Sequence, residues 1–175
     1  MTSGGGLARP SDPLDTSLLF EVFALNQAVG RFLADAMRGG PLSPAEYAIA
    51  SAIFELEAAS PTALAARLGM RLTTFIDHLR VLERRGFARR VPHPTDRRSY
   101  RVVLTAEGLA AHHAANRLFE AAHAAFVEAL GGGTVRARQV LQAMHEAADR
   151  VATSSSSRAA MSRAPSPRLS PARAG

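Results

Sequence analysis

Large apolar residues recur at helical spacing along most of the chain, and this periodicity predicts a run of helices. The first apolar series runs from Leu14 to Met37 and stops at the Gly-Gly-Pro sequence of 39–41. Its apolar residues are too many for one narrow stripe. A helix of this kind packs against more than one neighbour, and a second chain is one candidate neighbour.

Two shorter helices with clear start signals follow, and then a third. The Ser-Pro-Ala-Glu sequence at 43–46 contains an N-cap, a first-turn proline and a capping-box acid, and it opens a helix to about Ala58. A Ser-Pro pair at 60–61 opens a helix that ends at Gly69, and the next helix covers 72–85. Two helices joined by a tight turn that contains glycine have the spacing of a helix-turn-helix.

The sequence period then changes from that of a helix to that of strands. Residues 87–91 and 99–104 are short segments rich in β-branched or aromatic residues, and they flank a proline-bearing loop at 92–96. They predict a hairpin, and a hairpin directly after a helix-turn-helix is a wing. A long helix is predicted over 105–130, and after a glycine break a last helix runs to about Val151.

The predicted fold is therefore mainly α with a small β-hairpin wing, and its winged helix-turn-helix domain spans residues 41–104. Residues 1–13 and 153–175 combine Gly, Ser, Pro and Arg with few large apolar groups. We expect both ends to be disordered, because burial cannot offset the entropy lost on ordering them. The basic C-terminal tail would add a weak attraction to DNA that does not depend on sequence.

Positive charge is concentrated in one part of the chain. All 21 positive residues are arginine, against 15 acids, and the net charge is +6. Ten of these arginines, with three acids, lie in 67–101, and four more lie in 153–175. A local excess of this kind indicates a footprint for a polyanion, most simply nucleic acid, although a solvated arginine-rich face is an alternative.

Several classes of protein are excluded by composition and motif. Without cysteine there is no disulfide framework, thiolate metal site or thiol switch. No uncharged stretch approaches the ~20 apolar residues that span a bilayer, and the N-terminus lacks an apolar signal core. The chain also lacks a glycine-rich phosphate loop, a serine nucleophile elbow and paired catalytic carboxylates. We expect a reduced, soluble, cytoplasmic protein that is not an enzyme and has no catalytic residues, cofactor, metal or membrane partner.

The predicted helix at 72–85 has two contrasting faces on a helical wheel. Its apolar side consists of Leu72, Phe75, Ile76, Leu79 and Leu82. The opposite side carries hydroxyl and cationic groups: Thr73, Thr74, Asp77, Arg80, Val81, Arg84 and Arg85. Small hydroxyls allow close approach to a major groove, and guanidinium groups reach phosphates or guanine edges.

The hairpin tip carries two further arginines, which a stiff ribbon can bring into a minor groove. A solvated surface is the alternative for both the helix and the tip. The residues predicted to contact DNA, including one in the turn before the helix, are Arg71, Thr73, Thr74, Asp77, Arg80, Arg84, Arg97 and Arg98.

Five segments, taken together, resemble the MarR family of bacterial transcriptional regulators over roughly residues 15–151. They are the cap at 43–47, Leu-Ala-Ala-Arg-Leu-Gly at 64–69, Leu-Glu-Arg-Arg-Gly-Phe at 82–87, Asp-Arg-Arg-Ser at 96–99 and Leu-Thr-Ala-Glu-Gly at 104–108.

The resemblance implies a homodimer whose interface is a helical region formed by 14–40 and 105–152. It also implies repression or activation of transcription through double-stranded DNA. A phenolic or otherwise anionic small molecule, bound between the two regions, would relieve this control. A twofold dimer would read an inverted-repeat operator.

The resemblance also bears on individual residues of the reading helix. Thr73 and Thr74 match the family's hydroxyl positions, and Arg97 matches its wing arginine. The chain departs from the family where Ile76 and Asp77 replace a frequent Thr-Arg pair, so the base contacts are not carried over. Asp77 either accepts a hydrogen bond from a cytosine amino group or pairs with Arg80 or Arg84.

The sequence gives weaker signals for the effector site than for the DNA-binding residues. An apolar cleft between the dimer helices and the reading head would involve five aromatic residues, each of which is equally an ordinary core residue: Phe20, Phe23, Tyr47, Phe54 and Phe119.

Imidazole and carboxylate groups on the helix at 107–128 leave a metal-dependent alternative open. The groups are Glu107, His112, His113, Glu120, His123 and Glu128. Both group types bind zinc, and Glu120 and His123 are spaced i to i+3, but His112 and His113 point in different directions. The alternatives to DNA-dependent regulation are thus a zinc-responsive protein and a winged helix used only for protein contacts.

Overall fold

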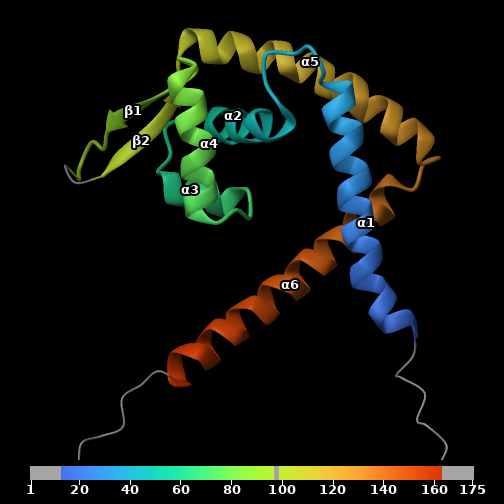
Figure 1. Ribbon diagram of the computed structural model, residues 1–175. Helices are drawn as coiled ribbons and strands as arrows, with labels where there is room; N and C mark the ends of the chain where they lie inside the picture. Colours follow the sequence, from blue (N-terminus) through green and yellow to red (C-terminus); the bar gives the residue numbers. More distant parts are fainter. Residues whose placement is uncertain (1–12, 97–98, 163–175) are drawn as a thin grey trace, which may run out of the picture. The chain divides into compact units, whose positions relative to one another are not determined.

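The computed structural model describes residues 13–96 and 99–162, and the chain divides into two compact units, Met1–Ala125 and Phe126–Gly175. The helices and strands of the described part are labelled in Figure 1. In order they are α1 (Pro13–Ala36), α2 (Pro44–Leu56), α3 (Pro61–Arg67), α4 (Leu72–Arg84), β1 (Ala88–Pro92), β2 (Tyr100–Leu104), α5 (Ala106–Ala129) and α6 (Thr134–Ser162). The prediction of a mainly α fold with a small β-hairpin is confirmed.

Side-chain caps begin three of the helices at the predicted places. The Ser43 hydroxyl accepts from the Glu46 N–H at 3.3 Å, and the Glu46 carboxylate accepts from the Ser43 N–H at 2.8 Å, which completes the capping box of α2. Ser60 caps α3 by accepting from the Ala63 N–H. The Thr105 hydroxyl accepts from the Gly108 N–H at 3.0 Å at the start of α5.

Two glycines shape the chain around the hairpin. Gly86 follows α4 with a φ of 74°, a left-handed conformation that glycine adopts without steric cost. Gly108 lies where α5 approaches the beginning of the hairpin, and a Cβ at this position would lie 1.8 Å from the Phe87 carbonyl oxygen. The first glycine lets the chain turn from α4 into β1, and the second lets α5 pack closely against that turn.

Strands β1 and β2 form an antiparallel hairpin whose register runs from Ala88 opposite Leu104 to Pro92 opposite Tyr100. The predicted wing is confirmed. The sequence did not predict an added bridge, in which the Val102 N–H donates to the Ala59 carbonyl oxygen at 2.9 Å. The segment between α2 and α3 thus pairs with the middle of β2.

The main hydrophobic core lies inside the winged helix-turn-helix. Its largest fully buried side chains come from α2, α3, α4 and β2: Ile49, Ile53, Leu64, Phe75, Leu79, Leu82 and Val102. Three of the five residues predicted for the apolar face of α4 are among them. Ile76 is half-buried and Leu72 is exposed, because Leu72 lies at the first position of the helix.

Helix α1 leaves a large apolar surface uncovered within its unit. Its exposed large side chains include Leu18, Leu19, Phe20, Val22, Phe23 and Leu25. Phe20 and Phe23 are 68% and 60% exposed, so the interpretation of these two as core residues is wrong for the single chain. Helical periodicity identifies an apolar face but does not identify what covers it.

The second unit contains the end of α5 and helix α6. Helix α6 continues to Ser162, so the prediction of a helix end near Val151 and of disorder from 153 is wrong for 153–162. The segment has no Gly or Pro to end the helix, and its last residues include the helix-favouring sequence Arg-Ala-Ala-Met at 158–161. The Thr153 and Ser154 hydroxyls also donate to the Asp149 and Arg150 carbonyl oxygens one turn back, each at 2.8 Å.

The disorder expected for 1–12 and 163–175 lies outside the described residues. None of the helices that the structure describes is both long and apolar enough to cross a bilayer.

Candidate nucleic-acid interface and effector cavity

The outer face of α4 gathers six of the eight residues predicted to contact DNA. All six are exposed, on the side of α4 opposite the buried Phe75, Leu79 and Leu82 or in the turn before the helix. They are Arg71, Thr73, Thr74, Asp77, Arg80 and Arg84. The other two, Arg97 and Arg98, lie outside the described residues. The helix thus presents hydroxyls near its N-terminus and guanidinium groups along its length.

Asp77 pairs with Arg80 on this face. The Arg80 Nη1 donates to the Asp77 Oδ1 at 2.9 Å, one helical turn away. Of the two interpretations of Asp77, ion pairing with Arg80 is the one that the structure contains. Both side chains are largely exposed, and exposed pairs of this kind contribute only about 0–1 kcal/mol, so the pair can exchange partners at little cost.

Three other arginines of the winged helix form no ion pair in the described part of the chain. Arg71, Arg84 and Arg89 are exposed, and none of them forms an ion pair within residues 13–96 and 99–162. Arg89 was not among the residues predicted to contact DNA, although its place in a predicted hairpin next to Arg90 was a usable signal. These unpaired guanidinium groups are available to phosphates.

Arg85, predicted on the outward face of α4, instead binds the rest of the protein. Its Nη1 donates to both oxygens of Glu46 at 2.9 Å, its Nη2 donates to the Pro41 carbonyl oxygen, and its guanidinium lies 4.6 Å from the centre of the Phe87 ring. Burial opposes ionisation of Glu46, but the hydrogen bonds from Ser43 and Arg85 outweigh it and lower the pKa of this carboxyl. Arg85 therefore fastens the end of α4 to the start of α2.

Arg90 on β1 is also held by contacts within the protein, although its side chain is partly exposed. It donates to both carboxylate oxygens of Glu83 on α4, from Nε at 2.7 Å and from Nη2 at 3.1 Å. Its guanidinium also lies 4.5 Å from the centre of the Tyr100 ring on β2. No local sequence signal marks this residue, because its two partners lie on two other elements, α4 and β2.

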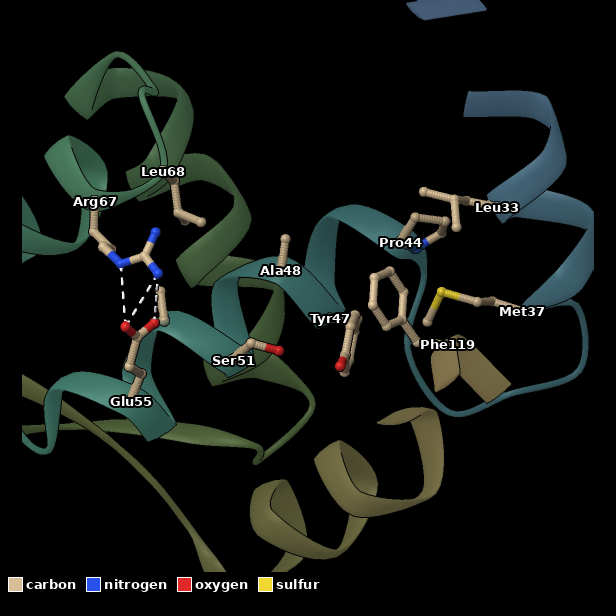
Figure 2. Close-up of a pocket in the computed structure, with 11 residues that line it drawn as sticks. Leu33, Met37, Pro44, Tyr47, Ala48, Ser51, Glu55, Arg67, Leu68 and Phe119 are labelled. Carbon is tan, nitrogen blue, oxygen red and sulfur yellow. Dashed lines mark hydrogen bonds and ion pairs between the residues drawn. The ribbon is translucent and has the colours of Figure 1, made fainter. Parts of the chain in front are cut away.

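A cavity of about 330 Å³ lies within the first unit, between α1, α2, α3 and α5 (Figure 2). Figure 2 shows apolar and aromatic side chains at one end and an ion pair at the other. Arg67 donates to Glu55 from Nη2 at 2.9 and 3.0 Å. The lining is formed by Leu33, Met37, Pro44, Tyr47, Ala48, Ser51, Ala52, Glu55, Arg67, Leu68 and Phe119.

Two of the five predicted effector residues line this cavity. Tyr47 and Phe119 lie with their ring centroids 4.9 Å apart. Phe54 lines a different hollow beside Leu109, and neither Phe20 nor Phe23 lines the cavity. The sequence analysis missed the polar groups of the lining, which include Ser51 and Arg67.

His112 is buried behind the cavity wall. Its ring is stacked with those of Tyr47 and Phe54, at 5.5 and 5.0 Å between centroids, and its Nε2 lies 3.1 Å from the Ser51 Oγ. Its Nδ1 has no hydrogen-bond partner among the described residues. Burial lowers the pKa of His112, and the neighbouring His113 lowers it further. The imidazole is therefore neutral at neutral pH.

The zinc alternative finds no cluster of ligands in the described residues. Residues 13–96 and 99–162 contain no group of three or more His, Asp or Glu side chains placed to hold a metal ion. Glu120 accepts a hydrogen bond from Asn116 at 2.8 Å, and the ring of His123 is stacked on that of Phe119.

Residues 42–100 match the family model described as the MarR family. This segment runs from the start of α2 to the start of β2, and it includes the whole outer face of α4. No curated protein matches the chain significantly.

Solved structures of transcriptional regulators share the fold over most of the chain. The M. tuberculosis regulator MOSR in complex with DNA is 25% identical, with a TM-score of 0.69 over 77% of this chain and 97% of MOSR. The repressor CouR bound to a 23-mer DNA duplex is 25% identical, with a TM-score of 0.66 over 77% of this chain and 94% of CouR. PcaV from Streptomyces coelicolor, in complex with its natural ligand, is 22% identical, with a TM-score of 0.68 over 81% of this chain and 98% of PcaV.

The sequence match and the shared fold agree on one family. Its members are transcriptional regulators and not enzymes. Residues 42–100 thus match the MarR family of transcriptional regulators in sequence, and the chain shares its fold with solved regulators of that family.

Proposed function

We propose that this protein binds double-stranded DNA by placing α4 in a major groove and the β1–β2 wing against the adjacent minor groove. The observation that carries the proposal is the outer face of α4, where Thr73, Thr74 and the unpaired Arg84 are exposed together. Short hydroxyls and guanidinium groups suit base edges and phosphates respectively. Two similar regulators, MOSR and CouR, were solved on DNA.

The protein acts as a homodimer on an inverted-repeat operator. The helical region formed by 14–40 and 105–152 makes the dimer interface, and the apolar surface of α1 supports this role because a single chain leaves it uncovered. A twofold dimer presents two copies of α4 to major grooves separated by about one helical turn, or about 34–36 Å. The regulator works in the cytoplasm, where bacterial DNA lies, and represses the genes beside its operator.

A small-molecule effector occupies the cavity lined by Tyr47 and Phe119 and releases the protein from DNA. The cavity of about 330 Å³ lies within the usual size range for ligand sites, and Ser51 and Arg67 supply the polar groups that fix orientation. Two similar regulators support this mode of control. PcaV was solved with its natural ligand, and CouR of Rhodococcus jostii was solved with p-coumaroyl-CoA.

Selection of bound sequences from random duplex DNA by the full chain tests the proposal. We expect an inverted repeat to be enriched. If binding neutralises roughly 6–10 phosphates, affinity falls by about 10³–10⁵ between 50 and 200 mM salt. The variant Arg84→Gln should bind more weakly, whereas Arg138→Gln on α6 is an equally exposed control that should bind like the parent.

Two results separate the parts of the proposal. A chain that ignores every duplex at low ionic strength would overturn DNA binding and favour a winged helix used for protein contacts. Aromatic acids screened against the complex should include compounds that dissociate it. If no compound that binds the protein changes its DNA affinity, effector control is wrong and DNA binding is unaffected.

A further inference from the structure

Three elements of the winged helix meet at one guanidinium group. Arg90, in the middle of β1, forms a two-pronged ion pair with Glu83 in the last turn of α4. On its other side it lies 4.5 Å from the centre of the Tyr100 ring. In the hairpin register Arg90 is opposite Val102, so Tyr100 is its diagonal neighbour on the facing strand. One side chain thus links the reading helix to both strands of the wing.

The neighbouring Arg89 shows that this arrangement is specific to one position. Successive strand residues point to opposite faces of the sheet, so Arg89 and Arg90 face opposite ways. Arg89 is exposed and forms no ion pair in the described part of the chain, whereas the Arg90 side chain is 42% exposed and binds three acceptor or ring groups. The Nε and Nη2 donors of Arg90 are occupied by Glu83, so Arg90 has fewer free donors for a phosphate than Arg89 has.

The chemistry of the link favours a fixed geometry. Two parallel hydrogen bonds between a guanidinium and a carboxylate fix the distance and the relative orientation of the two side chains. The contact of the guanidinium with the face of an aromatic ring limits its movement further. The hydrogen bond with Glu83 raises the pKa of Arg90, so the guanidinium keeps its charge. The Glu83 side chain is only 23% exposed, which reduces screening of the pair by solvent.

The position of Arg90 along the hairpin gives its contacts a large effect on where the wing tip lies. Hydrogen bonds from Thr105 to Phe87 and Gly86 hold the root of the hairpin, and Arg90 lies further out along β1. From Arg90 to the tip near Thr95 is about five residues, or about 16 Å at roughly 3.3 Å per residue. A tilt of about 15° at Arg90 therefore moves the tip by about 4 Å, which is more than a hydrogen bond to DNA tolerates.

The geometry points to Arg90 as a positioning residue for DNA recognition: through Glu83 and Tyr100 it fixes the angle between α4 and the wing, and it does not itself contact DNA. This inference rests on the proposed function, because it assumes that α4 and the wing bind one duplex together. Nothing in the resemblance assigns a role to Arg90, Glu83 or Tyr100.

Glu83→Gln gives the sharpest test, because a positioning role for Glu83 and a simple effect of overall charge predict opposite changes in DNA affinity. Removing a carboxylate from a DNA-binding surface strengthens binding if only the overall charge matters. If Glu83 holds Arg90 in place, the same change weakens operator binding by about tenfold, the size expected when a wing contact is lost. Glu107→Gln, at an exposed position in the first turn of α5, is the charge-matched control and should change affinity by less than about twofold.

A second measurement shows whether the effect passes through the wing. Hydroxyl-radical footprints of the parent complex should include minor-groove protection by the wing, and Glu83→Gln should lose it. Protection of guanine N7 in the major groove from dimethyl sulfate, which reports the contacts of α4, should remain. In a chain with Arg97→Ala and Arg98→Ala, adding Glu83→Gln should cause no further loss of affinity, because the wing contacts are already gone. Operator binding by folded Glu83→Gln that equals or exceeds that of the parent overturns the inference.

The charge-swapped pair Glu83→Arg with Arg90→Glu covers the case in which a single variant unfolds. We expect it to bind within about threefold of the parent, and each single reversal to bind at least about tenfold more weakly. A swap that is no better than the single reversals contradicts the inference. If the parent chain binds no duplex at all, the proposed function fails instead, and the two failures are distinguishable.

Discussion

Neighbouring arginines have different roles in this protein, because one step along a helix or strand changes the partners within reach. Arg84 is exposed, whereas the next residue, Arg85, binds Glu46 and lies over the Phe87 ring. Arg89 and Arg90 repeat this contrast on β1. The charge of the segment therefore overstates the charge that is free to meet DNA.

Alanine substitution should separate the two members of the first pair. Arg84→Ala should reduce the slope of log affinity against log salt by about 0.9, the value for one phosphate contact, with little change in stability. Arg85→Ala should reduce the unfolding free energy by roughly 1–3 kcal/mol, because it leaves the partly buried Glu46 carboxylate without its cation. Urea unfolding and DNA titration check both expectations. Equal stability of the two variants would contradict the role of Arg85.

Acid should destabilise the protein through His112. Burial lowers the pKa of this imidazole in the folded state, so the unfolded chain, with a histidine pKa near 6.5, binds the proton more readily. The contribution of His112 to stability is therefore fully present above pH 6.5 and is lost as the pH falls below that value. Unfolding free energies measured from pH 7.5 to 5.0 should decline less steeply for His112→Gln than for the parent.

Helix ends and the hairpin are the elements whose signals are local in the sequence. Caps at Ser43 and Ser60 act within three residues, and Gly86 closes α4 through its own backbone. These elements could be predicted from sequence for that reason. The Ala59–Val102 bridge joins segments that are distant in the chain and has no local signal.

The candidate site also has a part that local sequence signals predict and a part that they do not. The outer face of α4 follows from helical periodicity alone, so five of its residues could be placed from sequence: Thr73, Thr74, Asp77, Arg80 and Arg84. The partners of Arg85 and Arg90, and the cavity, depend on how separate elements pack against one another. The extension of α6 was missed for a different reason, since composition indicated disorder where hydroxyl-to-carbonyl hydrogen bonds and helix-favouring residues continue the helix.

Gly108→Ala tests the close approach between α5 and the start of the hairpin. The added Cβ would lie 1.8 Å from the Phe87 carbonyl oxygen, so the backbone must move. We expect the unfolding free energy to fall by about 1–3 kcal/mol or more, as for other overpacked sites. Gly133→Ala is the matched control, because a Cβ there meets nothing within 4 Å. Chemical denaturation that finds the two variants equally stable would contradict the packing described at Gly108.

At the scale of the whole molecule, the uncovered surface of α1 connects the proposed dimer to the proposed binding of an inverted repeat. An exposed patch of this kind is uncommon on a protein that functions as a monomer. An inverted-repeat operator is bound by two reading helices at once, so loss of the dimer would weaken binding even if each winged helix remained folded.

Phe23→Arg should dissociate the proposed dimer. Phe23 is 60% exposed in the single chain, and a charge at this position would be buried without a partner in an interface. Ala28→Arg is the control, because it adds the same charge on the side of α1 that carries Glu21 and Arg31. Sedimentation should give a monomer for the first variant and a dimer for the second, with weaker operator binding for the first. A dimeric Phe23→Arg would show that this part of α1 lies outside the interface.

Because the exposed cations of α4 and β1 are all guanidinium groups, as are all others in the chain, acetylation of lysine has no target on this surface. Guanidinium also stays protonated throughout the physiological pH range. Amine-reactive dyes would couple to the terminal amine alone and leave the winged helix unmodified. Such single-site labelling offers a direct fluorescent readout of complex formation.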